Sequence, residues 1–377
     1  MSLRRLWAVA RKEFLHVRRD ARSLGMGIAM PVLLLCLFGW ALTLDVDRVP
    51  LVVWDQCGSQ SSRDLAAELA GSRYFALRGR AGSYAEIERA IDRREALGAL
   101  VIPPDFDRRL WTGRGAPVQL IVDGSDANTA TIASGYAQAA VRGYSQGVVL
   151  REIRRTGLRP PAPPLDPRAR VWFNEDLTGR NYIIPGLIAV IMMVIAALLT
   201  ALTVAREWER GTMEQLVSTP LKGPELVLGK LLPYFAIGMF DVLLAVLMGA
   251  FLFGVPMRGS LALLFAMAAV FLAGALSLGM LFSIVTRSQL LASQMAMVLT
   301  FLPAFLLSGL MYAIPNMPAG IRAVTYLVPA RYFVHLLRGI YLKGVGLEVL
   351  APEAALLAAF SAAMIALAMR KFRKKLT

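Results

Sequence analysis

Residues 182–204 read YIIPGLIAVIMMVIAALLTALTV, a run without a single charged side chain. A helix of this length, rising 1.5 Å per residue, crosses the roughly 30 Å hydrocarbon core of a bilayer. Five further runs are also predominantly apolar: Leu24–Leu44, Leu228–Phe253, Leu261–Val285, Leu290–Ile314 and Ala351–Met369. The sequence therefore predicts an α-helical polytopic membrane protein with six transmembrane helices, the last five within residues 181–369.

Charge placement predicts the orientation. The chain is 56% hydrophobic and carries a formal net charge of +15. Basic residues crowd the segment 1–23 before the first run and the tail 370–377 after the last run. Basic residues beside span ends favour cytoplasmic retention, and they lie where a lipid bilayer presents anionic headgroups. We predict that both termini are cytoplasmic, that 24–44 is an uncleaved first span, and that nucleic acid is not a partner.

Residues 45–180 have the composition of an ordinary folded domain. Strand-like runs at 49–54, 74–77, 97–102 and 118–122 alternate with helical spacing at 61–70 and 83–96. A long helix is predicted from about 127 to 156, followed by a Pro-rich connector at 159–167. Alternating strands and helices indicate a small α/β domain. Its position between the first and second spans makes it extracytoplasmic, that is, periplasmic.

The segment 315–350 should also lie outside, although it carries more basic than acidic residues. Its apolar residues recur at helical spacing through Tyr332, Phe333 and Leu336. This pattern predicts a helix that lies at the membrane interface or re-enters the bilayer.

The sequence contains no strong motif for nucleotide binding, catalysis or metal binding. The stretch Gly223–Leu231 is not a phosphate loop, because its glycines have the wrong spacing and Leu231 stands where Ser or Thr would bind magnesium. Lys230 is then interpreted as a span-end anchor. Ser277 lies among small residues without a base, which favours close helix packing over catalysis. Two histidines and two cysteines, far apart, predict neither a metal site nor a disulfide framework. No enzyme activity and no bound cofactor are expected.

Asp241 is the one acid well inside a predicted span. Intramembrane carboxylates are energetically costly and often functional, so Asp241 suggests a role in proton or cation coupling. A structural hydrogen bond to a neighbouring helix explains the residue equally well.

The link 205–227, between the second and third spans, combines charge with apolar side chains. Glu207 and Glu214 are seven residues apart and share a face if the helix is continuous. Trp208, Met213 and Leu216 add apolar contacts. Such an element suits docking to a cytoplasmic partner; an interfacial helix with internal ion pairs is the alternative.

Several motifs in this order resemble the ABC-2-type permease family of bacterial exporters. The link contributes Arg206-Glu207-x-Glu209-x-Gly211-Thr212-x-Glu214-x-Leu216, followed by Thr219-Pro220, Glu225 and Gly229-Lys230. The amino-terminal part contributes Arg11-Lys12-Glu13-Phe14 and Arg18-Arg19-Asp20. The domain 45–180 contributes Val52-Val53-x-Asp55, Val101-Ile102-Pro103 and Val122-Asp123-Gly124-Ser125. The carboxy-terminal part contributes Ser308-Gly309-Leu310, Asn316-Met317-Pro318, Pro329-x-Arg331-Tyr332-Phe333 and Leu337-Arg338-Gly339.

The resemblance implies a permease subunit in a bacterial inner membrane. It would work as a homodimer or paralogue heterodimer with two ATPase subunits that use ATP and Mg, and sometimes with a periplasmic adaptor and outer-membrane channel. The residues Arg206 to Leu216 quoted above would receive the ATPase's motion, and Arg331, Tyr332, Phe333 and Arg338 would belong to an outer re-entrant helix. The chain departs from the family at Tyr312-Ala313, where an aromatic residue and a proline are common.

We predict an exporter of amphiphilic or hydrophobic compounds, such as drugs or lipid-like molecules. Asp241, Ser308, Gly309 and Tyr312 are the candidates for the translocation path. Two other classes stay open: an ion-coupled secondary transporter that uses Asp241, and a membrane-anchored sensor or scaffold whose outside domain binds a ligand.

Overall fold

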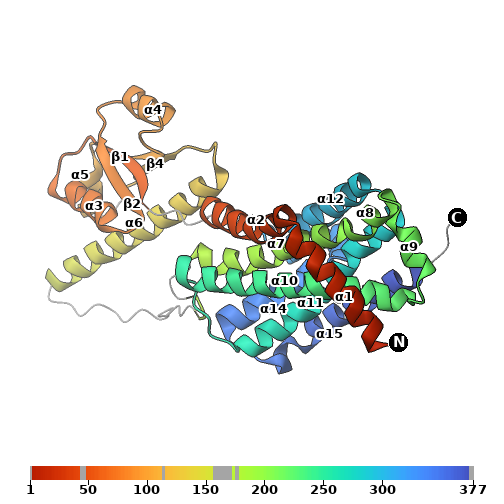
Figure 1. The fold of residues 1–377 in the computed structure, drawn as a ribbon. Coiled ribbons are helices and arrows are strands. Elements are labelled where there is room, and N and C mark those ends of the chain that lie inside the picture. The colour runs from red at the N-terminus through yellow and green to blue at the C-terminus, as the bar shows by residue number, and fades with distance from the viewer. Residues whose placement is uncertain (1, 43–47, 113–114, 156–171, 175–177, 373–377) are drawn as a thin grey trace. The chain divides into compact units, whose positions relative to one another are not determined.

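The computed structural model describes the chain except residues 1, 43–47, 113–114, 156–171, 175–177 and 373–377. The end of the first predicted span, the Pro-rich connector 159–167 and most of the basic tail lie outside the described residues. The chain forms two compact units, Met1–Leu44 with Arg170–Thr377, and Asp45–Ala169. We call them the helical unit and the α/β unit, and Figure 1 shows the elements of each.

The α/β unit is built on a four-stranded sheet with strand order β2-β1-β3-β4. The strands are β1 (Val49–Asp55), β2 (Phe75–Arg80), β3 (Gly98–Ile102) and β4 (Gln119–Val122). Strand β1 pairs in parallel with β2 and β3, and β3 pairs antiparallel with β4. The strands predicted from the sequence are confirmed; the placement of this unit outside the membrane stays a prediction.

Alternation along β1 divides the core of the α/β unit between the two faces of the sheet. Leu51 and Val53 pack on one face with residues of α3 (Gln60–Gly71), α5 (Phe106–Trp111) and α6 (Ala127–Arg155). Val52 packs on the other face with Ile87 of α4 (Tyr84–Asp92). Helix α6 is fastened to α3 where the buried Tyr144 hydroxyl donates to the Ser61 carbonyl at 2.9 Å.

Among the described residues of the helical unit, five helical stretches are long and apolar enough to cross a membrane. They contain α7 (Gly179–Ala201) with α8 (Thr203–Glu209), α10 (Gly223–Leu247) with a π-helical turn at Met248–Leu252, α11 (Leu261–Thr286), α12 (Gln289–Leu307) and α15 (Leu347–Lys371). The first predicted span corresponds to α2 (Ala21–Ala41), whose apolar part, Gly27–Ala41, is shorter. The protein is therefore a multi-pass membrane protein, and a count of six spans stays a prediction.

Helix α7 is the core of the helical unit, since almost every residue from Ile183 to Ala197 is buried. Small residues on α11 let neighbouring helices come close, as predicted for this stretch. A Cβ at Gly279 would meet the Ala197 carbonyl oxygen at 2.1 Å, and one at Gly274 would meet Ser361 Oγ at 2.5 Å. Thr200 Oγ1 on α7 donates to the Leu276 carbonyl at 2.7 Å, which attaches an α7 side chain to the backbone of α11.

Helix α1 (Leu3–Arg19) is amphipathic, and it packs one face on α10. Gly229 makes this approach possible, because a Cβ there would meet Val9 Cβ at 2.8 Å. The amino-terminal end of α1 is fixed where the Ser2 amide donates to Glu225 at 2.7 Å and Arg5 donates to the Pro220 carbonyl at 2.7 Å.

The segment predicted as an outer helix forms two helices, α13 (Ala319–Thr325) and α14 (Pro329–Arg338). Helix α14 ends in a π-helical turn at Gly339–Lys343, and a short 3-10 turn at Ile314–Asn316 precedes α13. Phe333 of α14 is fully buried and stacks on Phe271 of α11 with ring centroids 4.2 Å apart. Helix α14 is thus packed into the helical unit, whereas α13 is largely exposed.

Candidate functional site

The predicted coupling segment is not one continuous helix. It consists of α8 and α9 (Thr212–Ser218), separated by a turn in which Gly211 has φ 72°. Non-glycine residues rarely adopt this left-handed conformation, so glycine permits the break. The prediction that Glu207 and Glu214 share a helix face is therefore wrong: Glu207 is buried and Glu214 is exposed.

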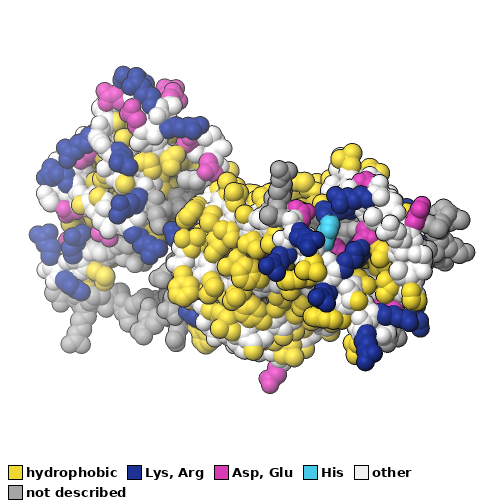
Figure 2. Space-filling model, viewed as in Figure 1, with side chains coloured by type: hydrophobic (Ala, Val, Ile, Leu, Met, Phe, Trp, Pro, Cys, Tyr) yellow, Lys and Arg dark blue, Asp and Glu magenta, His cyan; other side chains and the backbone are white. Residues whose placement is uncertain are grey.

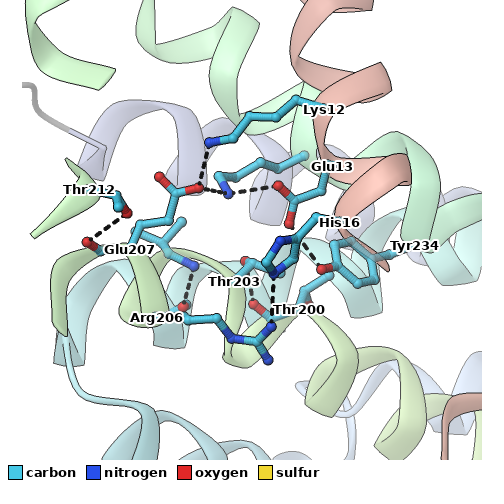
Figure 3. Close-up of polar contacts among 12 residues, drawn as sticks. Lys12, Glu13, His16, Thr200, Thr203, Arg206, Glu207, Thr212 and Tyr234 are labelled. Atoms are coloured by element: carbon cyan, nitrogen blue, oxygen red, sulfur yellow. Dashed lines mark hydrogen bonds and ion pairs between the residues drawn. The ribbon is translucent and has the colours of Figure 1, made fainter. Parts of the chain in front are cut away.

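Glu207 belongs to a buried ion cluster that joins three helices. Its Oε1 lies 2.8 Å from Lys230 Nζ on α10 and 3.3 Å from Lys12 Nζ on α1. Lys230 also lies 3.0 Å from Glu13 Oε2, and the Tyr234 hydroxyl donates to Glu13 Oε1 at 3.0 Å. Figure 3 shows these side chains converging from α1, α8 and α10. We call Lys12, Glu13, Glu207, Lys230 and Tyr234 the elbow cluster.

The interpretation of Lys230 as a span-end anchor is wrong, because the side chain is only 2% exposed and its ammonium contacts two carboxylates. Two lysines balance two glutamates in the elbow cluster. Burial of an unpaired charge is very costly, whereas paired buried charges retain much of their interaction. The cluster therefore holds α1, α8 and α10 in one arrangement, and loss of the buried Lys230 would leave buried carboxylates without their cation.

Arg206 of α8 makes a second set of contacts, to the end of α1 and the start of α12. Its guanidinium lies 3.6 Å from Asp20 Oδ2 at the end of α1, and its Nε donates to Gln289 Oε1 at 3.4 Å. Its Nη1 is 3.3 Å from His16 Nε2, as Figure 3 shows. Glu209 accepts a hydrogen bond of 2.7 Å from the Gln289 amide, so the end of α8 is attached to the start of α12.

Helix α9 presents a polar face that the helical unit leaves open. Thr212 Oγ1 donates to the Glu207 carbonyl at 3.3 Å, Met213 is buried, and Leu216 packs against the core. Glu214 and Gln215 are exposed on the opposite side. The apolar side of α9 packs next to the elbow cluster, and its polar side is exposed. Such a helix can transmit a displacement caused by a bound partner to α8.

Arg338 of the predicted outer helix contacts Gly309 of the predicted path. This glycine has φ 85°, and its carbonyl accepts hydrogen bonds from Arg338 Nη1 at 2.9 Å and the Tyr182 hydroxyl at 3.2 Å. The Arg338 guanidinium also lies 3.4 Å from the centroid of the Tyr182 ring. Ser308 is buried, with its Oγ accepting from the Leu310 amide at 3.3 Å, and Tyr312 is 60% exposed.

Arg331 and Tyr332 form a separate contact at the start of α14. The Arg331 guanidinium lies 3.8 Å from the Tyr326 ring centroid and donates to Thr325. The Tyr332 hydroxyl donates to the Tyr326 carbonyl at 2.7 Å. Both residues thereby fix the turn between α13 and α14.

Asp241 stands apart from Ser308, Gly309 and Tyr312. It is 1% exposed on α10 and faces Pro31 and Leu35 of α2. Neither carboxylate oxygen has a hydrogen-bond partner among the described residues. The structure therefore does not join the four predicted path residues into one surface within a single chain.

The sequence model of the family described as "ABC-2 family transporter protein" matches residues 22–370. The chain belongs to this ABC-2 family. It is 39% identical over 345 residues to the probable multidrug ABC transporter permease YbhS of Escherichia coli K12, covering 91% of this chain and 90% of the relative. It is 32% identical to the probable multidrug ABC transporter permease YbhR of the same strain, with 92% of each chain covered. The inner membrane transport permease YhhJ of that strain is 28% identical over 295 residues, or 77% of this chain and 76% of the relative.

This ABC-2 permease contains site residues that sequence reasoning did not assign. In the sequence, Lys12 and Glu13 belong only to an amino-terminal motif, and no motif singles out Tyr234. The available signal was a single charged residue, Glu13, on the apolar face of α1. Its neighbours on that face, Ala10 and Val17, are buried. Its partner Lys230 lies 217 residues away in sequence, so the pairing was not readable. Among the described residues, no group of His, Cys, Asp and Glu is placed to hold a metal ion.

Proposed function

We propose that this ABC-2 permease is the membrane-spanning subunit of an ATP-driven exporter whose ATPase is a separate chain. The substrate would be an amphiphilic or hydrophobic compound, taken from the cytoplasm or the inner leaflet. YbhS and YbhR carry multidrug ABC permease names, which supports this substrate class. In this proposal the chain has six spans, both termini are cytoplasmic, and the α/β unit is periplasmic.

The observation that carries the proposal is the arrangement of α9 beside the elbow cluster. The exposed face with Glu214 and Gln215 is free for a partner, while Glu207 at the end of α8 is bound to α1 and α10. Motion imposed on α9 would reach α7 through α8. It would reach α10 through the contact between Glu207 and Lys230. Two permease chains with two ATPase subunits would then alternate between inward and outward states. A periplasmic adaptor and an outer-membrane channel would be further partners.

The test is co-purification of an ATPase with the full chain from mild detergent, followed by measurement of ATP hydrolysis in the eluate. Glu214→Arg reverses a charge on the exposed face of α9 and should reduce the recovered ATPase several-fold. Glu348→Arg is the matched control, because Glu348 is also an exposed acid in the first turn of a helix, α15. Equal recovery with both variants and wild type would contradict docking at α9. Failure of the wild-type chain to recover any ATPase would contradict the exporter proposal.

A further inference from the structure

A cavity lies where α1 turns into α2; Tyr234 is the one member of the elbow cluster that lines it, and the exposed face of α9 does not take part. Its volume is about 190 Å³, and it is enclosed by α1, α2, α7, α8 and α10. On α2 the lining residues are Leu24, Gly27 and Met30, which recur every three residues and therefore lie on one helix face. We call this cavity the elbow pocket.

The elbow pocket is apolar along its length and polar at one end. On α7 it is lined by Ile195 and Leu199, followed by Leu202 beyond the end of that helix. The polar end is formed by Arg206, Asp20 and His16, which contact one another. An apolar cavity of roughly 150 Å³ stays dry and can bind a benzene-sized molecule, so this pocket has room for part of a hydrocarbon chain. Its polarity matches an amphiphile whose tail lies in the cavity and whose head lies beyond the polar end.

The pocket is accessible from the surface of the helical unit. Met30 at its rim is 40% exposed, and Leu198 and Ile237 are half-buried. These three residues belong to α2, α7 and α10, each of which is part of an apolar helix that faces lipid tails on its exposed side. A chain could therefore enter from the bilayer without any movement of the core.

A basic groove along the exposed face of α1 begins at the polar end of the elbow pocket. It shares His16 with the pocket and is lined by Arg4, Arg11 and Arg19 together with Trp7, which is 64% exposed. Figure 2 shows Lys and Arg side chains gathered over the part of the helical unit where α1 and α9 lie, beside a surface that is otherwise mainly hydrophobic. An amphipathic helix with exposed Trp and Arg binds anionic membrane surfaces.

We propose that the elbow pocket binds the apolar tail of an anionic phospholipid whose headgroup is held by the basic side chains of α1. Arg206 and Asp20 neutralise each other at the pocket mouth, and Lys12 is paired with Glu207. The surplus positive charge therefore comes from Arg11 and Arg19 of the groove, and it selects an anionic head over a zwitterionic one. The bound lipid would hold the α1–α2 elbow in place. The inference concerns the isolated chain and does not depend on a partner ATPase.

Gly27 provides a variant that fills the pocket. A Cβ at Gly27 would lie 3.2 Å from Leu199 Cδ2, the end of a flexible side chain, so a larger residue would occupy the cavity. Gly27→Leu should block the tail site. Gly25→Leu is the matched control, since Gly25 is on the same helix with open space around it and both changes alter helix propensity equally.

The experiment is native mass spectrometry of the purified full chain in detergent, titrated with phosphatidylglycerol or phosphatidylcholine of equal chain length. We expect one phosphatidylglycerol per chain, bound about tenfold tighter than phosphatidylcholine, which corresponds to roughly 1.4 kcal/mol. Gly25→Leu should keep this binding and Gly27→Leu should lose it. Equal binding of the two lipids would overturn the anionic headgroup, and equal binding by both variants would overturn the pocket.

A second measurement uses only wild-type protein, in case Gly27→Leu does not fold. Phosphatidylglycerol with a photoreactive group in its acyl chain is crosslinked to the full chain in nanodiscs, and the labelled peptides are mapped. Labels enriched at residues 24–30 and 195–202 over the exposed face of α12 would support the proposal. Labels spread evenly over α12 and α15, with no enrichment at those residues, would refute it.

Discussion

Lys230 on α10 places its Nζ 2.8 Å from Oε1 of Glu207 on α8, and the two side chains are only 2% and 11% exposed. The same ammonium contacts Glu13 on α1 at 3.0 Å. One buried cation therefore connects the amino-terminal helix, the end of the second apolar run and the start of the third. Because α9 follows α8 after a single turn, force on α9 acts next to this connection.

Replacement of Lys230 by Met should destabilise the protein strongly. The change leaves Glu207 with Lys12 and removes the cation that contacts Glu13, and breaking a buried ion pair on one side costs about 3–5 kcal/mol. Thermal unfolding of the detergent-solubilised chain should show a clearly lower Tm. Lys12→Met is the control, because Lys12 is 56% exposed and exposed pairs contribute about 0–1 kcal/mol.

Charge balance can be separated from packing with a second variant. Adding Glu207→Gln to Lys230→Met removes one of the two carboxylates, and part of the lost stability should return. If the loss of stability in the double variant equals the sum of the losses measured for Lys230→Met and Glu207→Gln separately, the cluster acts through packing alone. That result would contradict the electrostatic argument.

Gly211→Ala should weaken coupling more than its effect on stability suggests. Gly211 has φ 72°, a conformation that costs an alanine roughly 1–2 kcal/mol, and relief of this strain would redirect α9. ATP-dependent export, or recovery of the ATPase, should fall while the chain remains folded. Gly143→Ala in α6 is the control: Gly143 has open space around it in a helix, and alanine should stabilise there by about 0.5–1 kcal/mol. Full coupling in Gly211→Ala would contradict a role for the turn.

The sequence predicted what depends on local pattern. Long apolar runs predicted the helices that contain Leu187 and Leu272, and short strand-like runs predicted β1 and β3, because each signal is carried by neighbouring residues. The small residues Gly274 and Gly279 were correctly interpreted as contact points between helices. Membership of the ABC-2 family followed from several loose motifs in a fixed order.

Long-range pairing could not be predicted in the same way. The helical spacing of Glu207 and Glu214 assumed a continuous helix, but tertiary contacts of Glu207 and the conformation of Gly211 separate them. Lys230 has the sequence position of an interfacial residue, and only the approach of α1 at Gly229 makes it a buried one. A single sequence contains no signal that links position 13 to position 230.

Arg338→Lys should loosen the contact between α14 and α7. The guanidinium donates to the carbonyls of Tyr182 and Gly309 and stacks on the Tyr182 ring, and a lysine cannot do all three. Hydrogen bonds to a charged group contribute about 1.5–3 kcal/mol each, so the Tm should fall. Arg322→Lys on the exposed surface of α13 should leave it unchanged. An unchanged Tm in Arg338→Lys would show that this contact is not structural.

Asp241 allows a direct test of structure against function. The carboxyl group is buried on α10 without a hydrogen-bond partner among the described residues. No described hydrogen bond of this group therefore stabilises the fold. An unsatisfied buried polar group costs about 1–3 kcal/mol, and Asp241→Leu should therefore raise the Tm or leave it unchanged. Asp241→Asn keeps the size of the side chain and removes its acid, and it should behave similarly in the unfolding measurement.

Transport then decides the role of this residue. If Asp241 takes part in export, both variants should be stable and should export a fluorescent amphiphile from ATP-loaded cells far more slowly than wild type. If export by both variants equals that of wild type, Asp241 belongs neither to the translocation path nor to an ion-coupled mechanism. A large fall in Tm would instead mean that the carboxyl group has a structural partner beyond the described residues, and a second permease protomer is then the first candidate. The three outcomes are distinct because stability and export are measured on the same two variants.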